Sequence, residues 1–428
     1  MALDESTGTG RTRLTRSERN AFAGSVGGWA MDGFDIAIFS LVLAPVMATL
    51  LPASGYHADE ATVGYFGQIS AAVFLLGWGF SFVWGPIADR FGRRPAMIGS
   101  ILTFAVFTAA AGLAPNVWSW MAFRFLAAVG VGGEWAMAGT LVAESVPEKV
   151  RERLGGWLHS ATYVGTLLTA LIYLFFGEAL GWRGMFFFGL VPAVLVFFIR
   201  MGTHEPEKFA REKRTGPLWE PLAEILRPPY RRRTWTNLSL LVVCVIGLWA
   251  GSTYVPTAMT HLATVTGHSE SETVHLASLS SALAQVFTIL GCVAVPALAK
   301  RMGRRGALVL LYTLMIIGIG GTYGVAYPAQ NFTLFFCMLP ILGFGGANFA
   351  VFTIWLPEQY PTRVRATAFA FATTLSRWVA AAGTFAIAFG IQATGSLTVP
   401  LCMTALPFVA GILAVRLAPE TRGEPLPA

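Results

Sequence analysis

Residues 27–40 read Gly27-Gly28-Trp29-Ala30-Met31-Asp32-Gly33-Phe34-Asp35-Ile36-Ala37-Ile38-Phe39-Ser40, inside an apolar run from about Ala21 to Leu51. A run of that length can cross a bilayer as a helix, which needs about 20 apolar residues. The spacing of three puts Asp32 and Asp35 on one face of that helix. Charged groups at membrane depth cost about 2.5–3.5 kcal/mol each, so they face the interior of a helix bundle. The two carboxylates therefore mark a site for protons, ions or substrate, or else pair with an arginine and hold helices together.

The composition is that of a membrane protein with many spans. The 428 residues are 55% hydrophobic and 12% charged, and the mean hydropathy is +0.60, whereas soluble domains carry about 25% charged residues. The first twenty residues are polar and lack the apolar core of a signal peptide. We therefore expect the first span to stay in place.

The positive charges predict the orientation in the membrane. Except for Arg124 and Arg377 within spans and Arg183 in an opposite loop, Lys and Arg gather in alternate connections: 11–19, 90–94, 149–153, 200–233, 300–305, 363–365 and 416–422. By the positive-inside rule, both termini are cytoplasmic. The net charge of +7 is thus a topology signal, and we expect no nucleic-acid partner. The short outer loops favour a bacterial inner (plasma) membrane.

Neither a metal site nor a cofactor is expected. The four Cys lie in apolar runs without metal-ligand spacing, and the six His show no paired ligand pattern. No Walker loop, haem ligation or soluble catalytic domain is recognisable, and the glycines at 130–133 lie within a span. The sequence therefore predicts that the protein is not an enzyme.

Twelve apolar runs of membrane-spanning length follow one another: 21–51, 62–84, 95–114, 117–146, 154–178, 184–201, 235–262, 272–298, 306–327, 331–357, 366–392 and 396–416. A polar linker at 202–234 divides them into two groups of six. We expect a cytoplasmic tail at 1–20, six-helix bundles at 21–201 and 235–416, and a second cytoplasmic tail at 417–428.

The two halves repeat each other. Three pairs of segments match in order, at offsets of 211, 213 and 214 residues: Asp89-Arg90-Phe91-Gly92-Arg93-Arg94 with Lys300-Arg301-Met302-Gly303-Arg304-Arg305, Gly130-Val131-Gly132-Gly133 with Gly343-Phe344-Gly345-Gly346, and Glu144-Ser145-Val146-Pro147 plus Arg151 with Glu358-Gln359-Tyr360-Pro361 plus Arg365. Three matches at a nearly constant offset indicate a duplicated six-helix unit. Parallel repeats of this kind are a transporter design with the site at the midplane between them.

Over nearly its whole length the chain resembles the major facilitator superfamily. Residues 85–94, Gly85-Pro86-Ile87-Ala88-Asp89-Arg90-Phe91-Gly92-Arg93-Arg94, look like its signature loop, and Arg124 to Gly132 are similar to the fourth-span motif of proton-coupled members. The Asp32 to Asp35 stretch looks like the first-span motif of aromatic-acid:proton symporters and bacterial sialic acid transporters. Residues 132–135 and 181–187 are also similar to those groups. The resemblance implies an all-α membrane protein with twelve helices in two pseudo-symmetric six-helix bundles.

Asp35, Asp32, Arg124 and Glu134 are the candidates for proton coupling. In similar sugar:proton symporters an Asp of the first span pairs with an Arg of the fourth, and Asp35 and Arg124 match those positions. We expect Asp35 to carry the proton and Arg124 to act as its switch; a static ion pair is the alternative. Glu134 is a second possible proton site.

Arg377 is the candidate for binding a substrate carboxylate, because a guanidinium matches carboxylate geometry and related organic-anion carriers are similar in using a basic residue in this span. An internal ion pair with Glu134 is the alternative. The other candidate cavity residues, each of which could equally be a packing residue, are Asn348, Gln285, Tyr163 and His159.

The resemblance implies a gate at the cytoplasmic ends of the spans. Asp89 can cap a helix N-terminus or accept from an arginine, and its loop would latch the halves in one state; a pure topology signal is the alternative. The expected gating residues are Asp89, Arg90, Arg94, Glu144, Arg151, Glu358 and Arg365. Because Lys300 replaces Asp89 in the second copy, we expect the latch to be asymmetric.

The sequence thus predicts a secondary active transporter that carries a small organic anion together with protons by alternating access. The expected partners are the anion, protons and the bilayer, and the chain is expected to be a monomer, since the duplicated halves already enclose a site. Alternatives are a proton-independent exchanger or uniporter, an efflux carrier for another solute, a membrane sensor and, least favoured, a membrane enzyme.

Overall fold

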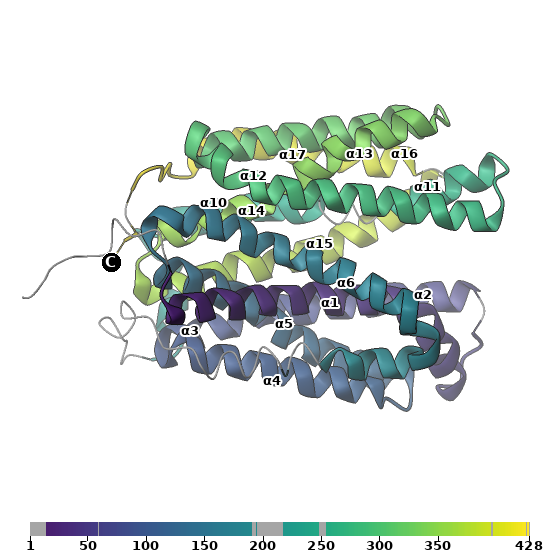
Figure 1. Cartoon of the computed structure of the whole chain (residues 1–428), viewed down its shortest axis with the longest axis horizontal. Helices are drawn as coiled ribbons and strands as arrows, with labels where there is room; N and C mark the ends of the chain where they lie inside the picture. Colours follow the sequence, from purple (N-terminus) through teal and green to yellow (C-terminus); the bar gives the residue numbers. More distant parts are fainter. Residues whose placement is uncertain are drawn as a thin grey trace, which may run out of the picture. The chain divides into compact units, whose positions relative to one another are not determined.

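The computed structural model describes residues 14–58, 60–190, 194, 217–247, 254–394, 397–424 and 426–427. These residues form helices and turns and include no strand (Figure 1). The larger stretches of the predicted organisation outside the described residues are most of the N-terminal tail, the end of the sixth span, about half of the 202–234 linker and residues 248–253 of the seventh span.

The helices of the first half are α1 (Arg16–Ala53), α2 (Glu60–Phe80), the short η1 (Ser81–Val83), α3 (Trp84–Phe91), α4 (Arg93–Gly112), α5 (Val117–Ser145) and α6 (Glu148–Phe188). They are followed by α9 (Glu220–Ile225), α10 (Arg231–Gly247), α11 (Val255–Val265), α12 (Glu270–Ile319), η3 (Gly320–Ala326), α13 (Phe332–Gly346), α14 (Asn348–Trp355), η4 (Pro357–Gln359), α15 (Thr362–Thr394), α16 (Thr398–Met403), α17 (Leu406–Ala414) and η5 (Val415–Leu417).

The chain divides into two compact units. The first comprises Met1–Ile225, Leu356–Ala370 and Gly423–Ala428, and the second Leu226–Trp355 and Phe371–Arg422. In the first unit α1 packs along α6 and α5, and α5 packs on α2 and α4. In the second unit α12 packs along α13, α11 and α17. A segment of the second half of the sequence, residues 356–370, thus packs with the helices of the first half.

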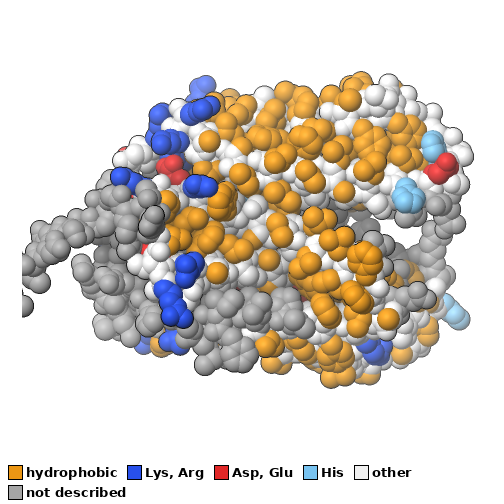
Figure 2. Space-filling view, in the orientation of Figure 1, with side chains coloured by type: hydrophobic (Ala, Val, Ile, Leu, Met, Phe, Trp, Pro, Cys, Tyr) orange, Lys and Arg blue, Asp and Glu red, His pale blue; other side chains and the backbone are white. Residues whose placement is uncertain are grey.

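Many of the helices suit a lipid environment. Seven segments of the described residues are long and apolar enough to cross a membrane, and one of them, His275–Ala326, covers two predicted spans. Figure 2 shows hydrophobic side chains along the length of the helices, and most of the Lys and Arg side chains that it shows lie near helix ends. The count of twelve spans stays a prediction.

Side-chain caps fix where the site-bearing helices begin. Thr15 starts α1: its hydroxyl accepts from the Glu18 N–H at 3.3 Å, and the Glu18 carboxylate accepts from the Thr15 N–H at 2.6 Å. Asn116 starts α5 by accepting from the Ser119 N–H at 2.8 Å. These caps satisfy backbone donors that a helix end leaves unpaired, and they set the register of α1 and α5.

Glycine sets the breaks in the long helices. Gly181 in α6 (φ 58°) and Gly303 in α12 (φ 78°) have non-helical backbone, and they lie between predicted spans five and six and between eight and nine. Gly92, which aligns with Gly303 in the repeat, separates α3 from α4 with φ 113°. Only glycine adopts such conformations at little cost, so the two copies of the repeated loop share one backbone device.

Close approach of α1 and α6 places the two first-span carboxylates. A Cβ atom on Gly33 would overlap the Thr162 carbonyl, and one on Gly165 would overlap the Ala30 carbonyl. Two α6 hydroxyls complete the contact, because Thr166 and Thr169 each donate at 3.2 Å to the carbonyls of Gly33 and Phe34. Small residues allow helix backbones to approach in this way.

We predict that Gly165→Ala loosens this contact. The added methyl meets backbone rather than a flexible side chain, so α1 and α6 must separate, and overpacking of this kind costs about 1–3 kcal/mol. Thermal melting of the purified protein in detergent should show a clear loss of melting temperature. The control is Gly320→Ala, whose methyl meets open space; equal melting of the two variants would contradict the close-contact account.

Candidate functional site

Asp35 and Arg124 form a buried, two-pronged ion pair in the first unit. Arg124 Nη1 donates to Asp35 Oδ1 at 2.8 Å and Nη2 donates to Oδ2 at 2.9 Å. Asp35 is 1% exposed and Arg124 is not exposed at all. The structure therefore brings together the two residues that the sequence pairs. Parallel N–H···O bonds are the strongest geometry for an arginine and a carboxylate.

Aromatic rings surround the guanidinium of Arg124. Its Cζ lies 5.5, 4.7 and 5.6 Å from the ring centroids of Phe39, Phe74 and Phe186. These rings come from α1, α2 and α6, so three of the helices that pack on α5 contribute to the environment of this one cation. The sequence did not predict these rings, although Phe39 and Phe186 lie in two of the stretches quoted above.

Two further carboxyl groups are buried close to this pair. Asp32 and Glu134 are both fully buried, and the Glu134 side chain lies directly against Gly28, one helical turn before Asp32 on α1. Residues i and i+4 share one face of a helix, so Asp32 and Glu134 belong to the same buried face. Neither Asp32 oxygen has a hydrogen-bond partner among the described residues.

An aromatic cluster closes this face. The Trp29 and Trp135 rings are stacked, with centroids 4.5 Å apart, and the His159 ring meets both edge-on at 5.4 and 5.3 Å. His159 is 1% exposed, and Tyr163, one turn further along α6, is half-buried with its ring 6.1 Å from His159. The α6 candidates named from the sequence therefore adjoin the Asp32 and Glu134 face.

The second unit holds the remaining candidates for substrate binding. Arg377 on α15 is 3% exposed, and its Cζ lies 5.3 Å from the centroid of Phe349 on α14. Asn348 is buried, and its side-chain amide donates to the Gly345 carbonyl at 2.8 Å across the break between α13 and α14. Gln285 on α12 is half-buried. Arg377 and Glu134 belong to different units, and the structure describes each by itself.

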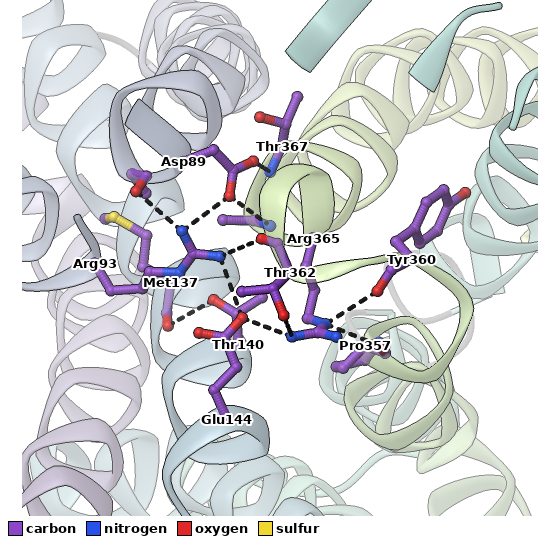
Figure 3. A network of polar contacts seen from close by, with 12 residues as sticks. Asp89, Arg93, Met137, Thr140, Glu144, Pro357, Tyr360, Thr362, Arg365 and Thr367 are labelled. Atoms are coloured by element: carbon purple, nitrogen blue, oxygen red, sulfur yellow. Dashed lines mark hydrogen bonds and ion pairs between the residues drawn. The ribbon is translucent and has the colours of Figure 1, made fainter. Parts of the chain in front are cut away.

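A second charged network lies where residues 356–370 pack into the first unit (Figure 3). Arg93 forms ion pairs with Asp89 at 3.0 Å and with Glu144 at 3.2 Å, and Arg365 Nη1 donates to the same Glu144 oxygen at 2.7 Å. Asp89 also accepts from the backbone N–H groups of Ala366 and Thr367 at 3.3 and 2.8 Å. Asp89 thus both accepts from an arginine and caps a helix, the two alternatives that the sequence left open.

Of the other expected gating residues, Arg90 and Arg94 directly follow Asp89 and Arg93 in the chain. Arg90 stacks on Phe91 at 5.4 Å, Arg94 is half-buried and Glu358 is buried in η4. Arg151 pairs with Glu148 at 3.1 Å and not with Glu144. Arg93, which was not singled out from the sequence, makes the central contact. The sequence signal for Arg93 is its position directly after Gly92, the residue at which α3 ends and α4 begins. Arg93 Nη1 donates back to the Ala88 carbonyl of α3 at 3.1 Å.

Among the residues that the structure describes, no group of three His, Cys, Asp or Glu side chains could hold a metal ion. The chemistry that these geometries offer is movement of protons on carboxyl groups and recognition of anions by buried arginines.

Comparison with known proteins places this geometry in a family. The family model for the Major Facilitator Superfamily matches residues 28–384. A probable 4-methylmuconolactone transporter of Cupriavidus pinatubonensis is 27% identical over 95% of this chain and 91% of that protein. A gentisate transporter of Corynebacterium glutamicum is 27% identical over 82% of this chain and 77% of that protein.

The sialic acid group is represented by NanX of Escherichia coli, 32% identical over 46% of each chain. Among solved structures, the proton:xylose symporter XylE bound to 6-bromo-6-deoxy-D-glucose superposes with a TM-score of 0.79 at 19% identity and covers 96% of this chain and 98% of that one. The expected helical major facilitator fold and the resemblance to aromatic-acid and sialic-acid carriers are confirmed, whereas the number of spans stays a prediction. This chain belongs to the major facilitator superfamily and is a secondary transporter of that type.

Proposed function

We propose that this transporter carries a small organic anion together with protons, by alternating access, and that Asp35 is the proton carrier. The observation that supports this most is the two-pronged Asp35–Arg124 pair, with both side chains buried and bonded at 2.8 and 2.9 Å. A proton-coupled transporter needs a group that takes and releases a proton when its surroundings change, and we propose that this pair provides it.

Proton binding and the ion pair compete for one carboxylate. Arg124 favours the ionised form of Asp35, whereas apolar surroundings oppose it. If bound substrate or a conformational change weakens the Arg124 contact, the carboxylate is left buried without compensation and takes a proton. Breaking a buried ion pair in this way is costly, so protonation and the conformational step become linked. A static pair would not respond to substrate.

Asp32 and Glu134 extend the proton path in this proposal. Asp32 is fully buried and without a hydrogen-bond partner in the described structure, and Arg124 is committed to Asp35. Two more ionised carboxylates on the same buried face would repel each other strongly. A proton held on Asp32 or Glu134 relieves that repulsion and can pass along the α1 face toward Asp35.

Arg377 is proposed to bind the substrate carboxylate. It is 3% exposed, and its guanidinium faces the Phe349 ring at 5.3 Å. A fork of N–H donors next to an aromatic face suits a carboxylate attached to a planar group. Gentisate is such a molecule, and it is the substrate in the name of one relative. Asn348, Gln285, Tyr163 and His159 are proposed as the polar lining.

The network of Asp89, Arg93, Glu144 and Arg365 is proposed as a gate. It holds the first turns of α15 against α3 and α5 through buried charges. Arg90, Arg94, Arg151 and Glu358 flank it, and all of these residues lie in or beside the basic connections that the positive-inside rule assigns to the cytoplasm. On this proposal the protein lies in a bacterial inner membrane with both termini in the cytoplasm.

Asp35→Asn should abolish accumulation driven by a proton gradient while leaving exchange of anion across the membrane. The amide keeps the shape but cannot release a proton. The measurement is uptake by proteoliposomes of labelled aromatic acids, short mono- and dicarboxylates and sialic acid, with and without an inward proton gradient. We expect the accumulation ratio of the variant to fall to about one.

The control for this experiment is Asp35→Glu, which keeps an acid at the site, with melting curves to show that each variant folds. Accumulation that ignores pH in wild type and in Asp35→Asn alike would overturn the proton role. It would favour the exchanger or uniporter and leave Asp35 as a structural partner of Arg124.

Arg377→Lys should weaken binding of the acid by about tenfold. Losing a charge-assisted, two-pronged contact costs about 1.5–3 kcal/mol, and each 1.4 kcal/mol is tenfold in affinity. The measured quantity is the KM for uptake. The neutral amide of the same acid, used as a competitor, is the control ligand. If Arg377→Lys changes the inhibition constant of the amide as much as the KM of the acid, Arg377 does not recognise the carboxylate.

Glu144→Gln should destabilise the gate. It removes the anion that Arg93 and Arg365 share, and breaking buried pairs of this kind costs about 3–5 kcal/mol. We expect a large drop in melting temperature and slower uptake. Glu148→Gln is the matched control, because its pair with Arg151 is 47% exposed on the Glu148 side and such surface pairs contribute about 0–1 kcal/mol. Equal effects would contradict the gate.

A further inference from the structure

We propose that the rings of Phe39, Phe74 and Phe186 form a cage that holds the Arg124 guanidinium whenever Asp35 is protonated. The cage would thereby set how readily the transporter takes up its proton. This inference rests on the proposed function, since it concerns the proton site, but one of its two tests does not depend on transport.

The geometry is that of a cation enclosed by ring faces. The Arg124 Cζ lies 4.7 Å from the Phe74 centroid and about equally far, 5.5 and 5.6 Å, from those of Phe39 and Phe186. All three distances are within the 6 Å over which a ring face attracts a cation. Phe74 and Phe186 are buried, at 3% and 0% exposure, so water does not screen the attraction.

The rings are locked in place by one another. Phe39 stacks on Phe74 and on Trp120, with centroids 5.9 Å apart in both pairs. Trp120 in turn meets Phe186 edge-on at 6.3 Å. Because the cage draws on α1, α2, α5 and α6, a ring cannot turn away from Arg124 without moving its neighbours. The cage is therefore present both before and after the proton binds.

Few other groups can stabilise the cation after Asp35 is neutralised. Both Nη atoms are used by Asp35, and Nε has no hydrogen-bond partner in the described structure. On α2 no residue between Phe66 and Val83 is titratable. The buried titratable residues on the other helices that pack here are Asp32 and Asp35 on α1, Arg124 itself, Glu134 and Glu144 on α5, and His159 on α6; Tyr163 and Tyr173 on α6 are half-buried.

The cage acts mainly on the protonated state. With Asp35 ionised, the pair is neutral overall, and the rings meet a charge that is already compensated. With Asp35 protonated, the bare guanidinium depends on the ring faces, whose attraction is largest when ring and cation are away from water. The rings thus lower the free energy of the protonated state relative to the paired state. They are positioning residues, since they act on proton binding through Arg124.

The cage also gives a role to residues 181–187, a motif to which the proposed transport mechanism assigns no role. Residues 181–187, Gly181-Trp182-Arg183-Gly184-Met185-Phe186-Phe187, resemble those of the organic-anion carriers. Within it Phe186 is fully buried and reaches Arg124, whereas Phe187 is exposed. On this inference the motif serves the proton site as well as the outer end of α6.

The first test is the pH dependence of uptake in Phe74→Leu, which removes the nearest ring face and keeps an apolar side chain. Proton binding becomes harder, so uptake should fall at lower pH than in wild type. We expect the pH of half-maximal uptake to drop by about one unit, a tenfold loss of proton affinity that corresponds to about 1.4 kcal/mol. Phe74→Tyr, which keeps the ring, should restore the wild-type midpoint.

The matched control is Phe80→Leu, the same substitution later on α2, where the ring pairs with Phe125 and is 42% exposed. Its midpoint should not move. If Phe74→Leu does not fold, the half-buried Phe39 carries the same test as Phe39→Leu. An unchanged or raised midpoint in the folded ring variant would overturn the cage. Uptake by wild type that is independent of pH would instead overturn the proposed proton coupling.

The second test measures melting alone. In Asp35→Asn, Arg124 loses the carboxylate that it is bonded to and depends on the rings throughout. Phe74→Leu should therefore lower the melting temperature more in the Asp35→Asn background than in wild type, as a double-mutant cycle with coupled positions. Equal losses in the two backgrounds would contradict the cage, whatever the transport assays show.

Discussion

The ion pair between Asp35 and Arg124 is the constraint on which the first unit depends. Two opposite charges that no solvent reaches must meet within bonding distance, and they lie on helices that begin about a hundred residues apart in the sequence. The Thr15 and Asn116 caps fix where these two helices begin, and the glycine contact holds α1 close to α6. Because a buried pair is at best marginally stabilising, its presence in the core points to a role beyond stability.

The two charged networks of the first unit differ in how they are balanced. Glu144 accepts from two arginines, and Asp89 is stabilised by Arg93 and by backbone N–H groups, so that each charge has a partner. On the α1 face, by contrast, Asp35 pairs with Arg124, whereas neither oxygen of the buried Asp32 has a hydrogen-bond partner among the described residues. The second copy of the repeated loop is anchored differently: Glu420 accepts from the backbone N–H groups of Arg304 and Arg305. The second loop has Lys300 at the position that aligns with Asp89, and its helix N-terminus is capped by Glu420 instead.

Much of this could be predicted from the sequence, because the strongest signals are local. Apolar runs, alternate basic loops and repeated glycines predict helices and their breaks, and Gly92 and Gly303 do end helical backbone. Charged residues of opposite sign within spans predict a buried ion pair, and Asp35 and Arg124 form one. Residues whose role depends on packing were missed: Arg93 is central through the turn at Gly92, and the rings around Arg124 converge from three helices. No spacing in the sequence encodes that convergence.

Asp35 is the proposed proton carrier, and its proton would move across the membrane together with the anion. The most direct test is to record pH in a lightly buffered suspension of proteoliposomes while the transported anion is added outside, with no gradient imposed beforehand. The account predicts that the outside pH rises as anion enters, because each anion takes protons with it, and that Asp35→Asn gives no such rise. Entry of the anion without any change in outside pH would contradict proton symport. The Asp35–Arg124 pair would then have a structural role only.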